Sequence, residues 1–506
     1  MSFPFFGEEF TFTQPDGGKL RVRGFGDQHH ARFETLDGFT VVRNPESGFF
    51  EYAAVTPTGA ALAPTGIRPG DVPAESIGLK PRLRPERRAA RAAAAAGEGL
   101  PHTGSRWQQR RESARLARAA EPGITRAPPQ RGTVGSYLGV CLLIQFPDVP
   151  YTIGPDEVDR FCNQEGYTGF GNNGSVYDYF KDVSTNKLFY KNLIAPYYTA
   201  RHPRSYYTDE SVRQPIRARE LILEAIDYHR ANGFDFSSVT VDDQNYVYAL
   251  NVYYAGARVN NWAKGLWPHS FHLATPVELA PAKFAFDYQF TDMGDQLTLG
   301  TFCHENGHMI CDFPDLYDYG AESRGIGSYC LMCAGGSRNK TNPTKVAAYL
   351  RYRAGWGDTI TRIATSGTFT AAADRNDLFI LEKSATEYYI LENRQQSGRD
   401  SRLTDAGLAI WHVDELGDNS DEQGTPTQHY ECALIQADGQ KHLEHGVNDG
   451  DDEDLYHLGG NDRFSASTDP ASAWWDGTAT SFEVHGIGAS ASSMTFSVAV
   501  GGPGDA

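Results

Sequence analysis

Apolar residues recur along this 506-residue chain in runs whose length and spacing predict strands and helices. Tyr137–Phe146 and Tyr246–Tyr254 are continuous apolar runs of strand length, as expected of strands that are buried inside a central sheet. Between them, apolar residues at helical spacing predict a helix over Ile216–Tyr228 that covers this sheet. A second helix is predicted over Leu297–Ile310, and it carries the most informative motif of the chain.

Short strands are predicted at both ends of the chain. Residues 1–78 contain aromatic and alternating runs between glycine-containing turns, which predicts a small β-rich domain. Beyond residue 358, turn residues separate several predicted strands, and their spacing predicts a β-sandwich over residues 358–506. These strands are Gly367–Ala372, Asp377–Lys383, Glu387–Arg394, Ala406–Val413, Cys432–Gln436 and Met494–Val500.

A third helix is expected where the central region ends. Asn342 is a good N-cap and Pro343 suits the first helical position, so the helix is expected to start there and to run to about Arg353. Gly355 and its neighbours end it. The expected fold class is therefore α+β and multidomain. It consists of a β-rich N-terminal domain (1–78), a linker (79–131), a central domain with a mixed sheet (132–357) and a C-terminal β-sandwich (358–506).

Charge sets the linker apart from the rest of the chain. Between Lys80 and Arg131 there are 13 Lys or Arg and 4 Asp or Glu, whereas the whole chain has a net charge of −18. The acidic body argues against nucleic acid as a partner. The linker is rich in Ala and Pro, and nascent helix is expected at Arg87–Ala96. The sequence contains no apolar run of 18 residues, so no membrane span is expected.

The candidate chemistry centres on His304, Glu305 and His308, which form a His-Glu-x-x-His motif. On a helix the two histidines are one turn apart and share a face, so both imidazoles can bind one zinc ion. Glu305 can then reach a metal-bound water, whose pKa zinc lowers from about 15.7 to about 7. The motif predicts a metal-dependent hydrolase with Glu305 as general base. The alternative is an ordinary exposed helix that happens to carry these three residues.

A catalytic zinc site needs a third protein ligand. Asp312, Asp315 and Asp318 follow the motif and are the candidates for it. Further along, Gly327 opens a tight turn that carries Met332, one of 5 methionines in the chain. Met332 either forms an apolar floor under the site or is an ordinary core methionine.

The motif and the Pro-Asp-Leu-Tyr-Asp that follows it resemble the immune inhibitor A family of metallopeptidases, which are zincins of metzincin type. Segments at residues 174–180, 267–269, 328–332, 342–344, 391–395 and 410–414 also resemble this family. The resemblance implies a zinc endopeptidase that acts on proteins or peptides, with a zincin-like catalytic domain over 132–357 and a Met-turn at Met332. It also implies an extracellular protein, although no signal peptide is visible at Met1–Glu9.

The third ligand is the point at which the sequence departs from the family pattern. The family has a Gly seven residues after the first His and a His or Asp three residues later, and Cys311 and Pro314 occupy these positions here. Asp312 tolerates the left-handed conformation better than Cys does, so the helix is expected to run one residue longer and to turn there. Asp315 then stands three residues past the turn and is the predicted ligand. Asp318 is the alternative, and its other role would be to orient a ligating histidine.

The N-terminal domain resembles the prodomain of the family. Its Asp27, His29 and His30 either cap the zinc or form a polar hairpin tip. We therefore expect a latent enzyme that is matured by cleavage in the basic linker, at Arg87-Arg88 or Arg110-Arg111. In the central domain, His269 either donates a hydrogen bond to the oxyanion of the reaction or is structural.

Two further features leave alternatives open. Seven cysteines, four of them near the motif (Cys303, Cys311, Cys330 and Cys333), either include a disulfide that braces the site or are small buried residues. The acidic run Glu444–Asp454 either holds Ca²⁺ or is a solvated loop. Two other functions also remain open. One is a non-catalytic adhesion or carbohydrate-binding protein that uses the C-terminal β-sandwich, and the other is a zinc hydrolase of cell-wall peptides or small molecules.

Overall fold

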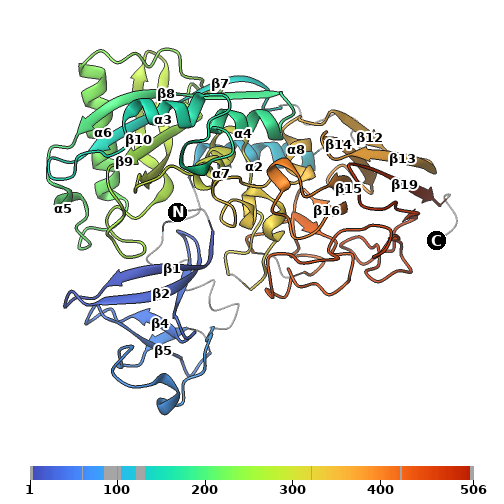
Figure 1. Ribbon diagram of the computed structural model, residues 1–506, viewed down its shortest axis with the longest axis horizontal. Helices are drawn as coiled ribbons and strands as arrows, with labels where there is room; N and C mark the ends of the chain where they lie inside the picture. The colour runs from blue at the N-terminus through green and yellow to red at the C-terminus, as the bar shows by residue number, and fades with distance from the viewer. Residues whose placement is uncertain are drawn as a thin grey trace.

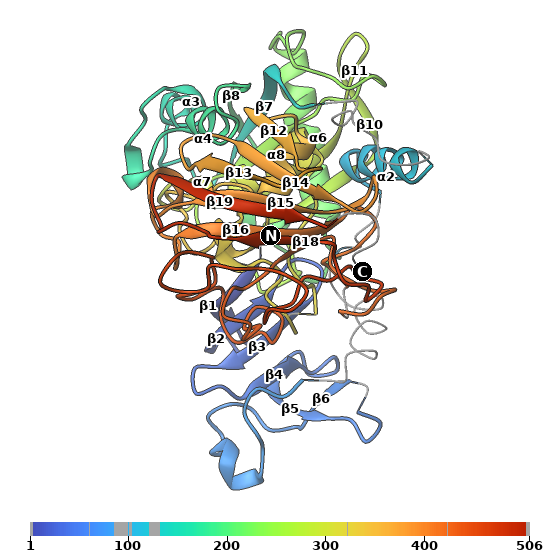
Figure 2. The same cartoon turned by 90° about the vertical axis from the view of Figure 1, so that its right-hand side faces the viewer.

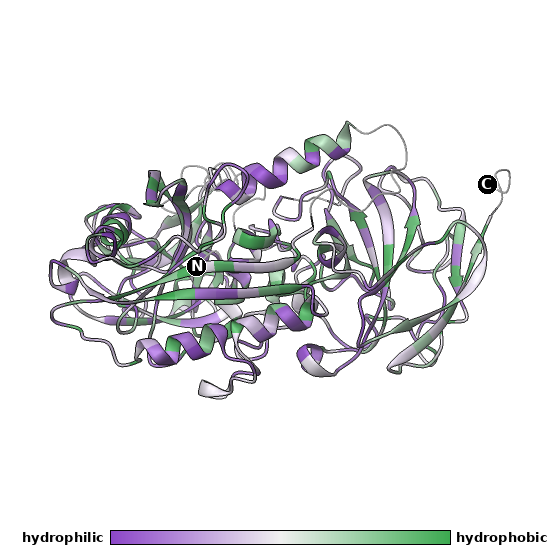
Figure 3. Cartoon of the chain, turned by 90° about the horizontal axis from the view of Figure 1, so that it is seen from above, coloured by the Kyte–Doolittle hydropathy of each residue, from purple (hydrophilic) through white to green (hydrophobic). Residues whose placement is uncertain are grey.

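The structure is a computed structural model that describes residues 4–59, 61–84, 100, 104–120, 132–320, 322–421 and 424–501. It is a mixed α+β fold with several sheets (Figure 1). Apolar positions alternate with polar ones along many of its strands (Figure 3), as expected of sheets with one face in a core. Within the described residues, no helix combines the length and the apolar character that a membrane span requires.

The N-terminal part is a six-stranded sheet in which the strands pair in chain order. Figures 1 and 2 both place this sheet at one end of the molecule. Its aromatic core also takes in Trp267 from the central part, whose ring lies 5.5 Å from that of Phe10. The sheet is therefore packed against the remainder of the protein. Its strands are β1 (Phe5–Thr13), β2 (Lys19–Gly26), β3 (Ala31–Thr35), β4 (Thr40–Arg43), β5 (Phe50–Val55) and β6 (Leu62–Pro64), followed by the 3₁₀ turn η1 (Ala74–Ile77).

The central sheet has the strand order β10-β11-β9-β7-β8, with parallel pairs except for the antiparallel hairpin β10–β11. It is the expected mixed sheet, and the two predicted apolar runs supply its neighbouring central strands β7 and β9. The hairpin places β10 at the edge, and neither of its strands was predicted because polar residues interrupt both. The strands are β7 (Gly135–Gln145), β8 (Leu188–Thr199), β9 (Leu250–Tyr254), β10 (His269–Ala280) and β11 (Lys283–Asp292).

Successive residues of β7 point into two different cores, because side chains alternate across a strand. Val140 and Leu142 join the core that holds the predicted helix α6 (Ile216–Ala231). Cys141 and Leu143 join a second core, with helices α3 (Pro155–Asn163), α4 (Val176–Val183) and α7 (Leu299–Cys311). The shorter elements of this region are η2 (Gly169–Gly171), α5 (Arg204–Tyr207), η3 (Gly327–Tyr329), η4 (Leu331–Gly335) and α8 (Ala348–Arg353).

The C-terminal part contains a five-stranded and a three-stranded sheet that enclose a common hydrophobic core. The opposite face of the five-stranded sheet packs into the same core as α7, through residues such as Ile390 and Trp411. The region after residue 358 therefore shares a core with the region before it. Its elements are β12 (Thr359–Arg362), β13 (Gly367–Ala372), β14 (Asp377–Glu382), β15 (Glu387–Arg394), η5 (Gly398–Asp400), β16 (Gly407–Asp414), β17 (Cys432–Leu434), β18 (Phe482–His485) and β19 (Ser493–Val500).

The prediction of a helix start at Pro343 was wrong, because α8 begins at Ala348. Contacts with the C-terminal region hold the preceding backbone out of a helix. The Asn342 side chain donates to Gly398 O at 3.0 Å instead of capping a helix. Farther along, the Lys345 N–H donates to Asp400 at 3.1 Å.

The segment 79–131 was expected to be an unpacked linker, and this was wrong for helix α2 (Arg106–Ala119). α2 lies against α7 and β11, and its arginines are paired with buried carboxylates. The Arg110-Arg111 cleavage site therefore lies inside a packed helix, whereas Arg87-Arg88 and the expected nascent helix lie outside the described residues.

The disulfide alternative was also wrong, since all seven cysteines are free and buried.

Candidate metal centre

Helix α7 carries both histidines of the motif and buries almost all of its length. It ends at Asp312, whose φ of 57° and ψ of 30° are left-handed, so the predicted turn at this residue is confirmed. Gly307 faces Met332, and a Cβ on Gly307 would lie 2.9 Å from the Met332 sulfur. The glycine therefore lets the buried methionine pack directly under the turn of helix that joins the histidines.

His304, His308 and Asp315 converge on one point and form a group that could hold a metal ion. The two Nε2 atoms lie 3.1 Å apart, and Asp315 Oδ1 lies 3.1 Å and 3.3 Å from them. Two nitrogen ligands at about 2.0–2.1 Å from a tetrahedral zinc are about 3.3 Å apart, so the spacing fits zinc. The donor set of two imidazoles and one carboxylate also suits this ion.

The other ring nitrogens hold the two imidazoles in place. His304 Nδ1 lies 3.0 Å from the carbonyl oxygen of Leu331, and His308 Nδ1 lies 2.6 Å from that of Phe313. A carbonyl can only accept, so each Nδ1 carries a proton, and each Nε2 is the nitrogen that lies next to Asp315. This is the usual way in which a metal-binding histidine is oriented from outside the metal shell.

The electrostatics of Asp315 match a ligand position. Burial alone would raise its pKa, but His308 and His304 hold the pKa of this carboxyl far below its usual range. In turn, burial would lower the pKa of His308, but Asp315 raises it above its ordinary value. Tyr319 donates its hydroxyl proton to Asp315 Oδ2 at 2.9 Å and leaves Oδ1 directed at the histidines.

Asp318, the alternative third ligand, makes a tight turn instead. Its carboxylate accepts the backbone N–H groups of Gly320, Glu322 and Ser323 at 2.8–3.0 Å. Glu305 is 2 % exposed and follows His304 directly on α7. The structure thus brings together His304, His308 and Asp315 and assigns Asp318 a local backbone role.

His269 does not belong to this group. It is buried in strand β10, where Nδ1 lies 2.7 Å from Trp267 O and Nε2 lies 3.0 Å from the Tyr288 hydroxyl. Burial lowers the pKa of His269 to about 3, so the ring is neutral. Both nitrogens are occupied within the sheet, which is the structural role considered above.

The N-terminal sheet and helix α2 cover the site from outside. The ring of Trp107 is stacked on that of His308, with centroids 4.6 Å apart and planes 24° from parallel. The side-chain amide of Gln28 exchanges two hydrogen bonds of 2.7 Å with the backbone of Ser270 on the edge strand β10. Together with His29 these residues line a cavity of only about 20 Å³ that reaches His308 and Asp315.

Asp27, His29 and His30 form the hairpin tip between β2 and β3. Asp27 Oδ1 accepts the N–H groups of His29 and His30 at 2.7 Å and 2.9 Å. Asp27 Oδ2 accepts a 2.9 Å hydrogen bond from Tyr317, just beyond the third candidate ligand. The tip thus contacts the site without adding a residue to the metal-capable group.

Ion pairs made by the arginines of α2 hold this helix against the site. Arg110 lies 2.7 Å from Asp312 at the end of α7 and 3.3 Å from Asp242, and it donates to Met309 O at 2.9 Å. Two turns farther on, Arg118 lies 3.3 Å from the buried Glu415 beyond β16. Helix α2 therefore bridges the metal-capable helix and the C-terminal sheet.

A second group that could hold a cation consists of Asp438, His442 and Asp451, all partly exposed. Of these, only Asp451 lies in the acidic run Glu444–Asp454, for which calcium binding and a solvated loop were the two alternatives. The run contacts the segment that leads to Met332, since the Ser328 N–H donates to Asp449 O at 2.8 Å.

Trp107, Tyr319 and Gln28 are contact residues that sequence reasoning missed. A lone tryptophan in an arginine-rich segment was the available signal for Trp107, and the position four residues after Asp315 was the signal for Tyr319. No local pattern distinguishes Gln28. In comparisons with known proteins, no family model and no curated sequence matches the chain.

Proposed function

We propose that the protein is a zinc endopeptidase of metzincin type, related to the immune inhibitor A metallopeptidases and captured here in a latent form. The observation that carries the proposal is the convergence of His304, His308 and Asp315 with protons fixed on both Nδ1 atoms. The zincin-like catalytic domain, the Met-turn at Met332 and an extracellular location belong to the same proposal.

His304, His308 and Asp315 would hold the zinc, which supplies a bound water with a pKa of about 7 and a Lewis acid for the scissile carbonyl. Glu305 takes the proton of the attacking water and passes it to the amine of the leaving peptide. Without the metal, the two histidines hold the pKa of the Asp315 carboxyl far below its usual range, so an anionic ligand is available to a cation. Tyr319 keeps the Asp315 carboxylate oriented through its hydroxyl.

The edge strand β10 is where a polypeptide substrate would bind. β10 is paired with β11 on one side and, within the part of the chain that the structure describes, with no strand of the sheet on the other. An extended peptide could therefore pair with this second side by backbone hydrogen bonds. Gln28 supports this assignment, because its amide imitates a peptide group in its two bonds to Ser270. The scissile bond of such a peptide would then pass over the metal site, where Trp107 now lies.

Latency follows from the same contacts. Trp107 occupies the face of His308, and Gln28 occupies the strand edge. Activation requires that α2 and the hairpin tip move away from the metal site. Cleavage at Arg87-Arg88 and within residues 121–131 would permit this movement.

The test is to measure the zinc content of the purified full chain and its hydrolysis of casein before and after limited trypsin treatment. We expect one zinc per chain, little hydrolysis by the intact chain and a large gain after the cut. Absence of zinc would point to the adhesion or carbohydrate-binding alternative. Zinc without hydrolysis of casein after cleavage would point to cell-wall peptides or small molecules as substrates.

A further inference from the structure

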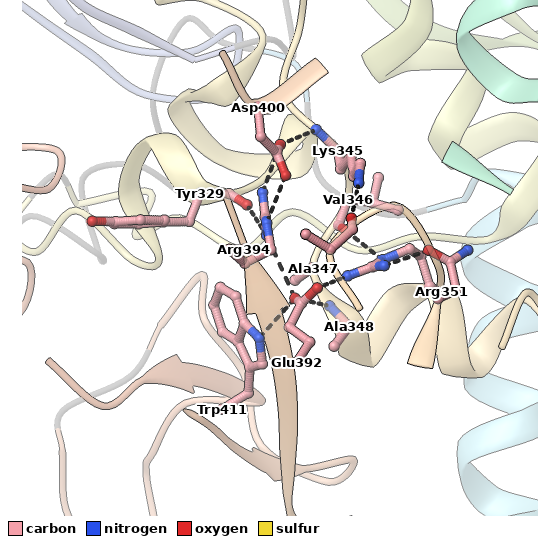
Figure 4. A network of polar contacts seen from close by, with 12 residues as sticks. Tyr329, Lys345, Val346, Ala347, Ala348, Arg351, Glu392, Arg394, Asp400 and Trp411 are labelled. Atoms are coloured by element: carbon pink, nitrogen blue, oxygen red, sulfur yellow. Dashed lines mark hydrogen bonds and ion pairs between the residues drawn. The ribbon is translucent and has the colours of Figure 1, made fainter. Parts of the chain in front are cut away.

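A buried network of charges joins the C-terminal sheet to α8 and to the backbone at Tyr329 (Figure 4). Arg394 on β15 holds Asp400 with two parallel hydrogen bonds of 2.8 Å. Glu392, two residues earlier on the same strand, pairs with Arg351 of α8 and accepts a 3.0 Å hydrogen bond from the indole of Trp411. All five side chains are buried, and such groups persist only where partners compensate them.

One nitrogen of Arg394 also reaches the backbone near the metal site. Arg394 Nη1 donates to the carbonyl oxygen of Tyr329 at 3.0 Å (Figure 4). This carbonyl stands two residues before Leu331, whose own carbonyl accepts the Nδ1 proton of His304. Arg394 is thus separated from a metal-capable histidine by a short stretch of backbone.

The same stretch also supports the third candidate ligand. Met332 O accepts the backbone N–H of Leu316 at 2.8 Å, and Leu316 directly follows Asp315. The segment from Tyr329 to Met332 therefore positions two of the three metal-capable side chains. Met332 within it and Cys333 directly after it depart from helical backbone angles, so a regular helix does not fix its shape.

We infer that Arg394 is a positioning residue for the metal site: its guanidinium fixes the carbonyl of Tyr329, and through this backbone it sets the orientation of His304 and Asp315. The inference rests on the proposed function, since it concerns the same site. It assigns the C-terminal sheet a part in zinc binding, although that sheet contributes no ligand.

The network contains its own matched control. Arg351 is as deeply buried as Arg394, pairs with the same Glu392, and also donates to a carbonyl oxygen, that of Val346, at 2.9 Å. Val346 lies outside the stretch from Tyr329 to Met332. Arg394→Met and Arg351→Met therefore each remove one buried cation from the network, but only the first releases the backbone next to His304.

The experiment compares the zinc dissociation constants of the full-length wild type, Arg394→Met and Arg351→Met by competition with a chelator, well below each melting temperature. Loss of contacts that orient metal ligands typically weakens metal binding about 10–100-fold. We expect at least a tenfold loss for Arg394→Met and less than a threefold change for Arg351→Met. The visible absorption of the cobalt-substituted protein should shift in the first variant only.

Equal zinc affinities in Arg394→Met and the wild type would overturn the inference, and so would equal losses in both variants. If Arg394→Met does not fold, Arg394→Lys replaces it, because it keeps the charge but loses the two-pronged bond to Asp400. The Arg394→Lys variant should then bind zinc more weakly than the wild type but more tightly than a protein without any cation at this position. Wild-type zinc affinity in this variant would count against the inference. A wild type without zinc would instead refute the proposed function itself.

Discussion

The indole of Trp107 lies face to face with the imidazole of His308, the second histidine of the His-Glu-x-x-His motif. Trp107 belongs to helix α2, some 200 residues before His308 in the sequence. The contact therefore joins a segment that looked like a linker to the centre of the candidate site. The stack excludes solvent from that face of His308, and in the proposed enzyme it would also exclude substrate.

The first prediction concerns the ion pairs that keep α2 on the metal site and thereby inhibit the proposed enzyme. Arg110→Met should raise hydrolysis of casein by the uncut chain at least several-fold, because Arg110 makes the ion pairs that connect α2 with Asp312 and Asp242. Glu112→Ala is the control, since Glu112 is exposed on the same helix. A chain that is fully active before any change or cleavage would contradict latency.

Glu305→Ala should retain zinc and lose hydrolysis by about 10²–10⁴-fold in kcat, because the ligands remain while the general base is removed. His308→Ala should lose both zinc and hydrolysis. Zinc analysis and casein turnover of the trypsin-activated variants separate the two effects. Hydrolysis by Glu305→Ala at close to the wild-type rate would show that another group is the base.

The third ligand can be tested by a pair of aspartates. Asp315→Ala should weaken zinc binding by orders of magnitude, whereas Asp318→Ala should keep zinc and lower the melting temperature, because Asp318 holds three backbone N–H groups of its turn. Chelator competition measures the first effect and thermal unfolding the second. The opposite pattern would transfer the ligand role to Asp318.

The attachment of the hairpin tip should depend on pH. Burial lowers the pKa of His29 to about 4, so the folded protein keeps this ring neutral while an unfolded chain would protonate it below about 6.5. The unfolded state then binds more protons, and stability falls as pH falls from about 6.5 to 4. His29→Gln should flatten this part of the plot of melting temperature against pH. An unchanged slope would remove His29 from the explanation.

The second group that could hold a cation gives a metal-removal test. If Asp438, His442 and Asp451 bind calcium, EGTA at fixed zinc should lower the melting temperature by several degrees, since an ion bound only to the folded state adds stability. Asp438→Asn combined with Asp451→Asn should make the protein insensitive to EGTA. A melting curve that EGTA does not change would identify a solvated loop.

The elements that could be predicted from the sequence are those whose conformation is determined by their own residues. The apolar runs of β7 and β9 and the amphipathic pattern of α6 are set by their own residues, and the structure agrees with them. The left-handed turn at Asp312 was also predictable, because conformational tolerance of a residue type is a local property. The start of α8 was not, since Asn342 and Lys345 are bound by residues more than 50 positions away.

The covering of the site was beyond sequence reasoning for the same reason. In isolation the arginines of α2 indicate a solvated basic segment, and only Asp242, Asp312 and Glu415, from three separate loops, make them buried partners. His269 illustrates the converse. One of its two alternatives was a hydrogen bond to the oxyanion, yet Tyr288 on the neighbouring strand lies 3.0 Å from its Nε2.

The shared core between α7 and the C-terminal sheet gives the protein an order of assembly. Strands β1–β6 are synthesised before the central and C-terminal strands, and domains fold as units while synthesis proceeds at about 5–20 residues per second. The backbone under His304 is completed only when Arg394 has been made, on the order of tens of seconds later. In the proposed enzyme, the nascent chain therefore contains its inhibitor before it contains a working hydrolytic centre, and the cell that synthesises it is protected throughout translation.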